Sequence, residues 1–173
     1  MNRRNFISSI ISALLYICHT KLSAVEKSSN SAADFLEAPN LIKNTTAIIT
    51  DPIFLEHHIA PDHPESPDRI EYVQKTLSEC DLSKNTKKIN SSANISEWIK
   101  TIHTTEHIES IKHSSPIAHK VATAGVRAAL TGVDKVVTKE FTNAFCATRP
   151  PGHHALNTGR VEGFCYYNNI AIA

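Results

Sequence analysis

Three short β-prone runs, separated by much longer helix-prone stretches, limit most strongly how this chain can fold. The runs cover residues 46–50, 87–90 and 143–147. Between them, apolar residues recur at helical spacing, for example at Ile70, Val73 and Leu77. Strands that alternate with helices favour a parallel sheet with helices packed on it. We therefore predict an α/β fold with a parallel sheet for residues 46–173.

Two stretches between the second and third runs have helical character. In the first, apolar residues share one face and the pattern continues along the chain through Ile95, Ile99, Ile102, Ile108 and Ile111. The second, at 121–130, is rich in alanine, which allows close packing. We expect the histidines of this region to lie on helix surfaces or to be partly packed. They are His103, His107, His113 and His119.

Charge and composition exclude several functional classes. Lysine and arginine number 18 and aspartate and glutamate 17, so the net charge of +1 argues against a nucleic-acid-binding protein. No apolar run reaches the roughly 18 residues that a stable membrane span needs. The four cysteines form no C-x-x-C pair, which leaves zinc-finger and thioredoxin-like interpretations without support. The 10 histidines instead point to metal or acid–base chemistry.

The first 24 residues have the layout of a signal peptide. Arg3 and Arg4 precede a short apolar stretch that ends near Cys18, and Ala24 closes a small-residue cleavage site. The segment at 3–7 is also similar to the twin-arginine export motif. We predict a signal peptide at 1–24, a linker at 25–45 and export to a bacterial periplasm. The alternatives are an amphipathic N-terminal helix or an uncleaved anchor, and a cytoplasmic location.

The paired histidines His153 and His154 are the main candidates for catalysis. They follow the third β-prone run, after two prolines that fix the backbone and a glycine, Gly152, that allows an unusual turn. Catalytic groups of parallel α/β sheets lie at the carboxyl ends of the strands. Two imidazoles there can divide the work, one as general base and acid and the other as a charged partner. Downstream, Gly163 can expose its backbone to a ligand, and Phe164 can wall a narrow pocket.

Four segments of this chain, in order, resemble the histone deacetylase superfamily. They are His63-Pro64-Glu65-Ser66-Pro67-Asp68-Arg69-Ile70, Ile102-His103-Thr104-Thr105-Glu106-His107-Ile108, Arg149-Pro150-Pro151-Gly152-His153-His154-Ala155 and Gly163-Phe164-Cys165-Tyr166-Tyr167-Asn168-Asn169. The Arg-Pro-Pro-Gly run is closer to the class II and bacterial acetylpolyamine amidohydrolase branch than to class I. The resemblance implies the N-terminal part of the three-layer arginase/deacetylase-type fold.

The resemblance also implies a reaction and site residues. Members of the family are zinc amidohydrolases that remove acyl groups, usually acetyl, from an amine, so acetyl-lysine or an acetylated small amine such as a polyamine is the expected substrate. It implies that His154 is the general base and acid and that His153 is its electrostatic partner. Among substrate-binding residues, Gly163 would offer its carbonyl, Phe164 would line the tunnel and Cys165 would lie near the acetyl pocket. Arg69 would lie deep, near the inner end of the tunnel.

This chain also departs from the family pattern. The zinc ligands of the family match positions beyond Ala173, so we expect no metal ligand within this chain, a truncated domain and an inactive protein as given. The segment between Ile111 and Val121 is shorter than in relatives, where that loop helps to hold substrate. One alternative function is a non-catalytic fragment or interaction protein. Another is a periplasmic His-rich metal-binding protein that uses His57, His58 and His63.

Overall fold

The computed structural model describes residues 45–80, 86–158 and 161–173. The predicted signal peptide at 1–24, and the predicted linker at 25–45 except for Thr45, lie outside the described residues. Both assignments therefore stay predictions.

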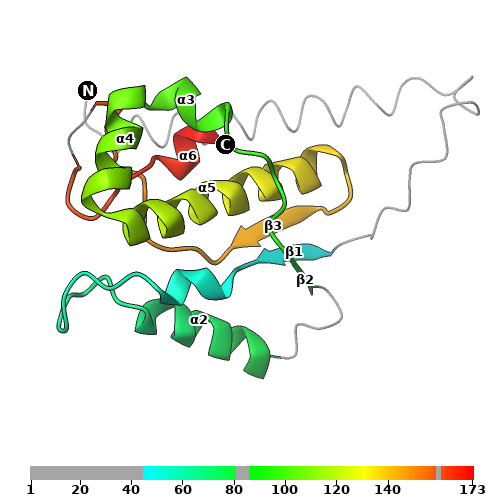
Figure 1. Cartoon of the computed structure of the whole chain (residues 1–173). Helices are drawn as coiled ribbons and strands as arrows, with labels where there is room; N and C mark the ends of the chain where they lie inside the picture. The colour runs from blue at the N-terminus through cyan, green and yellow to red at the C-terminus, as the bar shows by residue number, and fades with distance from the viewer. Residues whose placement is uncertain (1–44, 81–85, 159–160) are drawn as a thin grey trace, which may run out of the picture. The chain divides into compact units, whose positions relative to one another are not determined.

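The core of the described chain is a parallel sheet of three strands, as the sequence predicts. The strands are β1 (Thr46–Ile49), β2 (Thr86–Ile89) and β3 (Asn143–Cys146), in the order β2-β1-β3 (Figure 1). Both neighbours run parallel to β1, and Ile49 lies opposite Ile89 on one side and Cys146 on the other. Because the strands end in step, the segments that follow β1 and β3 leave the same edge of the sheet.

Helices cover both faces of this sheet. The helical elements are η1 (Pro52–Leu55), α2 (Asp68–Glu79), α3 (Trp98–Ile102), α4 (Thr105–Ser114), α5 (Pro116–Val137) and α6 (Asn169–Ile172). The long helix α5 lies on one face of the sheet and α2 on the other, while α3, α4 and α6 lie beyond α5 (Figure 1). A parallel sheet with helices on both faces is an α/β arrangement, so the predicted α/β class is confirmed.

The join between α4 and α5 consists of one residue, Ser115. Pro116 begins α5 directly, in the first helical position, where its missing N–H costs no hydrogen bond. As a result α5 extends over 22 residues, well beyond the predicted helical stretch at 121–130. The segment between Ile111 and Val121, which we identified as short, is therefore helical except for the tight turn at Ser115.

Helix α5 separates two apolar clusters. Toward the sheet, Val121, Ala124 and Ala128 pack against β1 residues Ala47 and Ile49. On its other side, Ala122, Val126 and Leu130 pack against α3, α4 and α6. Full burial of a Val, Leu or Ile side chain contributes roughly 1.5–3 kcal/mol to folding, and burial of an Ala methyl group contributes less. Burial on both sides of α5 therefore fixes α3, α4 and α6 relative to the sheet.

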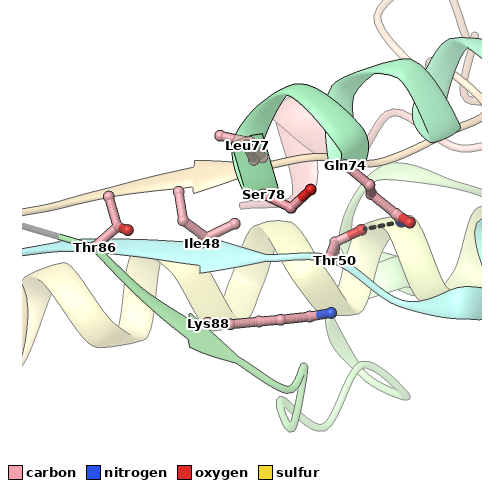
Figure 2. Close-up of a pocket in the computed structure, with 7 residues that line it drawn as sticks. All are labelled: Ile48, Thr50, Gln74, Leu77, Ser78, Thr86 and Lys88. Atoms are coloured by element: carbon pink, nitrogen blue, oxygen red, sulfur yellow. Dashed lines mark hydrogen bonds between the residues drawn. The ribbon is translucent and has the colours of Figure 1, made fainter. Parts of the chain in front are cut away.

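A small hollow remains between α2 and the sheet. It measures about 190 Å³ and is lined by Ile48, Thr50, Gln74, Leu77, Ser78, Thr86 and Lys88 (Figure 2). The Gln74 side-chain amide donates to the Thr50 hydroxyl at 3.0 Å across it (Figure 2). No residue predicted to act in catalysis or substrate binding lines this hollow, so it is a gap in packing rather than the candidate site. In the part of the chain that the structure describes, no helix has the length and apolarity needed to cross a membrane.

Candidate active site

A buried ion pair joins the two loops that leave the carboxyl edge of the sheet. Arg149 Nε and Nη2 donate to Glu65 Oε1 and Oε2 at 3.1 and 2.7 Å, and Arg149 Nη1 donates to the Phe54 carbonyl at 2.6 Å. The side chains of Glu65 and Arg149 are each 1% exposed. A bidentate guanidinium–carboxylate pair has a fixed geometry. The pair therefore ties the segment that leads to His153 and His154 to the loop after β1.

Arg69 does not occupy the deep position that we expected. Its Nη1 donates to Glu65 Oε1 at 3.1 Å, but its side chain is 57% exposed. The buried place beside the Glu65 carboxylate belongs to Arg149, because Arg149 engages both carboxylate oxygens and a main-chain carbonyl as well. In the described residues Arg69 lies at the surface end of this ion-pair network. Its part in substrate binding stays a prediction.

His153 and His154 lie on an exposed turn, with their ring centroids 4.3 Å apart and their planes tilted by 54°. The turn is held by its neighbours. Gly152 packs so closely on the next part of the chain that a Cβ at this position would lie 1.9 Å from the Tyr167 carbonyl oxygen. The Ala155 N–H donates to the Gly152 carbonyl at 2.9 Å. Both imidazoles are therefore accessible while their backbone is fixed.

A pocket of about 390 Å³ brings His154 together with three predicted substrate-binding residues. It is lined by His154, Leu156, Glu162, Gly163, Phe164 and Cys165. Gly163 has φ of +61°, a conformation that glycine adopts without the steric penalty of a Cβ. The turn there is closed by the Cys165 N–H, which donates to the Glu162 carbonyl at 3.1 Å. These four residues therefore share one pocket, Arg69 is not among the residues that line it, and the predicted roles of all of them stay predictions.

Two histidines that the sequence suggested only as metal ligands contact the segment that follows Gly163. The His63 ring meets the Phe164 ring edge to face at 5.3 Å, and the His57 ring meets Tyr166 in the same way at 5.5 Å. His57 is 5% exposed, and its Nε2 has no hydrogen-bond partner among the described residues. Burial, and then the positive charge of Arg149, lower the pKa of His57. Burial, and then the Glu65 carboxylate, raise the pKa of Tyr166.

The prediction for His103 and His107 was wrong. They are 2% and 0% exposed, and their rings stack at 4.8 Å with planes 17° apart. The sequence spacing could have predicted this burial. His103 and His107 lie four residues apart, and the buried residues Ile99 and Ile111 lie four residues before and after them. His113 is exposed, as expected, and His119 is partly buried, with its Nδ1 2.7 Å from the Tyr167 hydroxyl.

The described residues do not fit a zinc ion by themselves. No group of three or more histidine, cysteine, aspartate or glutamate side chains is placed to hold a metal within the ranges 45–80, 86–158 and 161–173. Catalytic zinc sites use about three protein ligands. The loop histidines also do not converge as a His-rich metal site requires, since His57 is buried while His58 is exposed. We therefore assign no chemical step to a metal.

Comparison with known proteins decides the family. A model of the histone deacetylase domain matches residues 63–173, which is well over half of the chain. The chain belongs to the histone deacetylase superfamily. The predicted resemblance is thus confirmed, and the matched region contains all the residues that line the pocket.

Individual relatives agree with this assignment. The chain is 34% identical over 145 residues to the uncharacterized protein slr0245 of Synechocystis, covering 73% of this chain and 47% of that protein. It is 27% identical to a histone deacetylase-like amidohydrolase of Pseudomonas aeruginosa, covering 66% and 33%. The crystal structure of the HDA15 HD domain matches with a TM-score of 0.66 at 24% identity, covering 75% and 42%, which supports the fold. The chain thus spans less than half the length of these relatives.

Proposed function

We propose that this chain supplies the acyl pocket and the proton-transfer histidines of a zinc-dependent amide hydrolase that removes acetyl or other acyl groups from lysine or polyamine amines. One observation carries the proposal: His154 opens onto the same pocket as Gly163, Phe164 and Cys165. The superfamily assignment supports the reaction class. We assign no zinc ligand to the described residues.

The chemistry assigned to this chain is proton transfer and substrate placement. The acyl group enters between Phe164 and Cys165, and the exposed Gly163 carbonyl accepts the substrate N–H. His154 takes a proton from water as the water oxygen bonds to the amide carbon. When the carbon–nitrogen bond breaks, His154 returns that proton to the leaving amine, giving a free amine and a carboxylic acid, which then loses its remaining proton to solvent. His153, 4.3 Å away, stays beside it as an electrostatic partner.

The test uses a chimera, because the chain spans only part of its relatives. Residues 46–173 are fused to the part of the Synechocystis relative that follows its matched region. We expect zinc-dependent hydrolysis of acetyl-lysine peptide or acetylputrescine in the chimera and none in the isolated chain. His154→Ala should lower turnover by about 10²–10⁴-fold without loss of bound zinc. The matched control is His113→Ala, an exposed histidine outside the pocket.

Two results would count against this proposal. Loss of zinc in His154→Ala would make His154 a ligand rather than a proton-transfer group. A folded, zinc-loaded chimera without turnover on any acylated amine would favour the non-catalytic alternative instead.

We also propose that residues 1–24 direct export. The support is the pattern of Arg3 and Arg4 before a short apolar stretch. A reporter fused to residues 1–30 should reach the periplasm of a bacterial host and be cleaved near Ala24. Replacing both arginines by lysine should block twin-arginine export while keeping the charge. A reporter that stays cytoplasmic with the natural sequence would refute the proposal.

A further inference from the structure

Two stacked histidines form hydrogen bonds with the main chain of residues 166–168, which follow the pocket residue Cys165 in the sequence. His103 ends α3 and His107 lies in the first turns of α4, and both side chains are buried. The Asn168 N–H donates to His103 Nε2 at 2.9 Å. His107 Nε2 lies 2.8 Å from the Tyr166 carbonyl, which can only accept, so this nitrogen carries the proton.

The two contacts require opposite tautomers. His103 must leave Nε2 unprotonated and carry its proton on Nδ1, which has no hydrogen-bond partner among the described residues. His107 must carry its proton on Nε2. Which nitrogen of a neutral histidine is protonated follows from such partners. The stack therefore offers one acceptor and one donor to the main chain on the two sides of Tyr167.

The segment between these contacts is fixed from other directions as well. The Tyr167 ring is 2% exposed and lies 5.4 and 5.9 Å from the rings of His103 and His107. Its hydroxyl meets His119 Nδ1 at 2.7 Å. The Asn168 side-chain amide donates to the Ala155 carbonyl at 3.3 Å. The same short stretch thus contacts three helices and the turn that carries the paired histidines.

Both parts of the candidate site rest on this stretch. Cys165 and Phe164 precede it directly, and Gly152 packs on its Tyr167 carbonyl oxygen with no room for a Cβ. We propose that His103 and His107 are positioning residues that hold the main chain around Tyr167. Through this main chain they fix the positions of Phe164 and Cys165 and of the turn at 152–154. Their importance for hydrolysis rests on the proposed function, but their effect on the position of the pocket does not.

The test follows the position of the pocket in the full chain through the labelling rate of Cys165, which is 2% exposed. Each histidine is replaced by leucine, which packs but cannot hydrogen-bond, and by glutamine, whose amide group can replace a contact at Nε2. Labelling by iodoacetamide is measured for each cysteine by mass spectrometry. We expect about tenfold faster labelling of Cys165 in His103→Leu and His107→Leu, and restoration in the glutamine variants. Cys146, in the other apolar cluster, should keep its rate.

A second measurement on the unaltered chain does not depend on how the variants fold. Nitrogen-15 NMR of the imidazoles should show His103 protonated on Nδ1 and His107 on Nε2. The same tautomer on both rings would overturn the proposal. So would unchanged Cys165 labelling in the leucine variants, or a rise shared equally with Cys146, which would indicate general loosening. None of these measurements needs turnover, so an inactive enzyme would refute the proposed function alone.

Discussion

Gly152 is the residue whose replacement the structure opposes most directly. A Cβ there would lie 1.9 Å from the Tyr167 carbonyl oxygen and 2.8 Å from Asn169 Oδ1. Neither group has space to move, because Tyr167 is 2% exposed and Asn169 is 9% exposed. A single added methyl group must therefore push the turn that carries His153 and His154 away from its support.

We expect Gly152→Ala to lower the free energy of unfolding by about 2–3 kcal/mol, the cost of overpacking a rigid site. The matched control is Gly163→Ala, which meets no atom within 4 Å and suffers only from its positive φ. That strain costs about 1–2 kcal/mol. Urea denaturation of both variants measures the difference. A Gly152→Ala variant as stable as the original chain would refute the close packing.

The ion-pair partner of Glu65 shows which contacts cannot be predicted from the spacing of residues in the sequence. Arg69 lies four residues from Glu65, a spacing that suggests a local ion pair, and the two side chains do meet. The buried bidentate partner is nevertheless Arg149, 84 positions away in the chain. Local spacing cannot reveal it, because the contact exists only once β1 and β3 have brought their following loops together.

At the scale of elements, the packing around α3 and α5 lowers the pKa of two histidines, His103 at the end of α3 and His119 in α5. Burial, and then the neighbouring His107, lower the pKa of His103 to about 4. Burial also lowers the pKa of His119. As the pH falls below about 6.5, these histidines become protonated in the unfolded chain but stay unprotonated in the folded chain. The free energy of unfolding is therefore highest above about pH 6.5 and decreases as the pH falls toward 4.

For His103 alone this loss amounts to about 2–3 kcal/mol between pH 7.5 and pH 4.5, at 1.36 kcal/mol per pKa unit. Urea denaturation at the two pH values measures it. His103→Gln cannot titrate, so the fall in its unfolding free energy over this range should be smaller by that amount. An equal fall in both proteins would show that His103 is protonated as easily when folded as when unfolded.

The elements themselves follow the sequence closely. The three predicted runs coincide with β1, β2 and β3 to within one residue at either end, because short β-prone runs between helices leave few other possibilities. The burial of His103 and His107 was missed because the apolar pattern was followed through the isoleucines alone. Their spacing with Ile99 and Ile111 already placed them on an inward face.

At the scale of the whole molecule, one apolar surface stands out among the described residues. A hollow of about 590 Å³ on α5, β3 and α6 is lined mainly by small and aliphatic side chains. Val137 and Ile170 are 73% and 72% exposed there. Contiguous exposed apolar surface of this kind binds hydrophobic dyes and reduces solubility.

We expect the chain to enhance the fluorescence of the dye ANS, and the double variant Val137→Glu with Ile170→Glu to lose about half or more of that signal. The control is Tyr72→Glu on α2, a side chain that is also 73% exposed but lies outside the hollow. A fluorescence titration makes the comparison. Equal losses in the two proteins would place the dye elsewhere.

The central position of β1 has a consequence for how the chain is made. Thr46 pairs with Thr86 on one side and with Asn143 on the other. Of the three described strands, β1 is therefore made first and its neighbour β3 last, and at about 5–20 residues per second β1 stays without that neighbour for several seconds. Pairing across such separations closes long loops and is slow. During that interval Ala47 and Ile49 are open to chaperones and to other nascent chains.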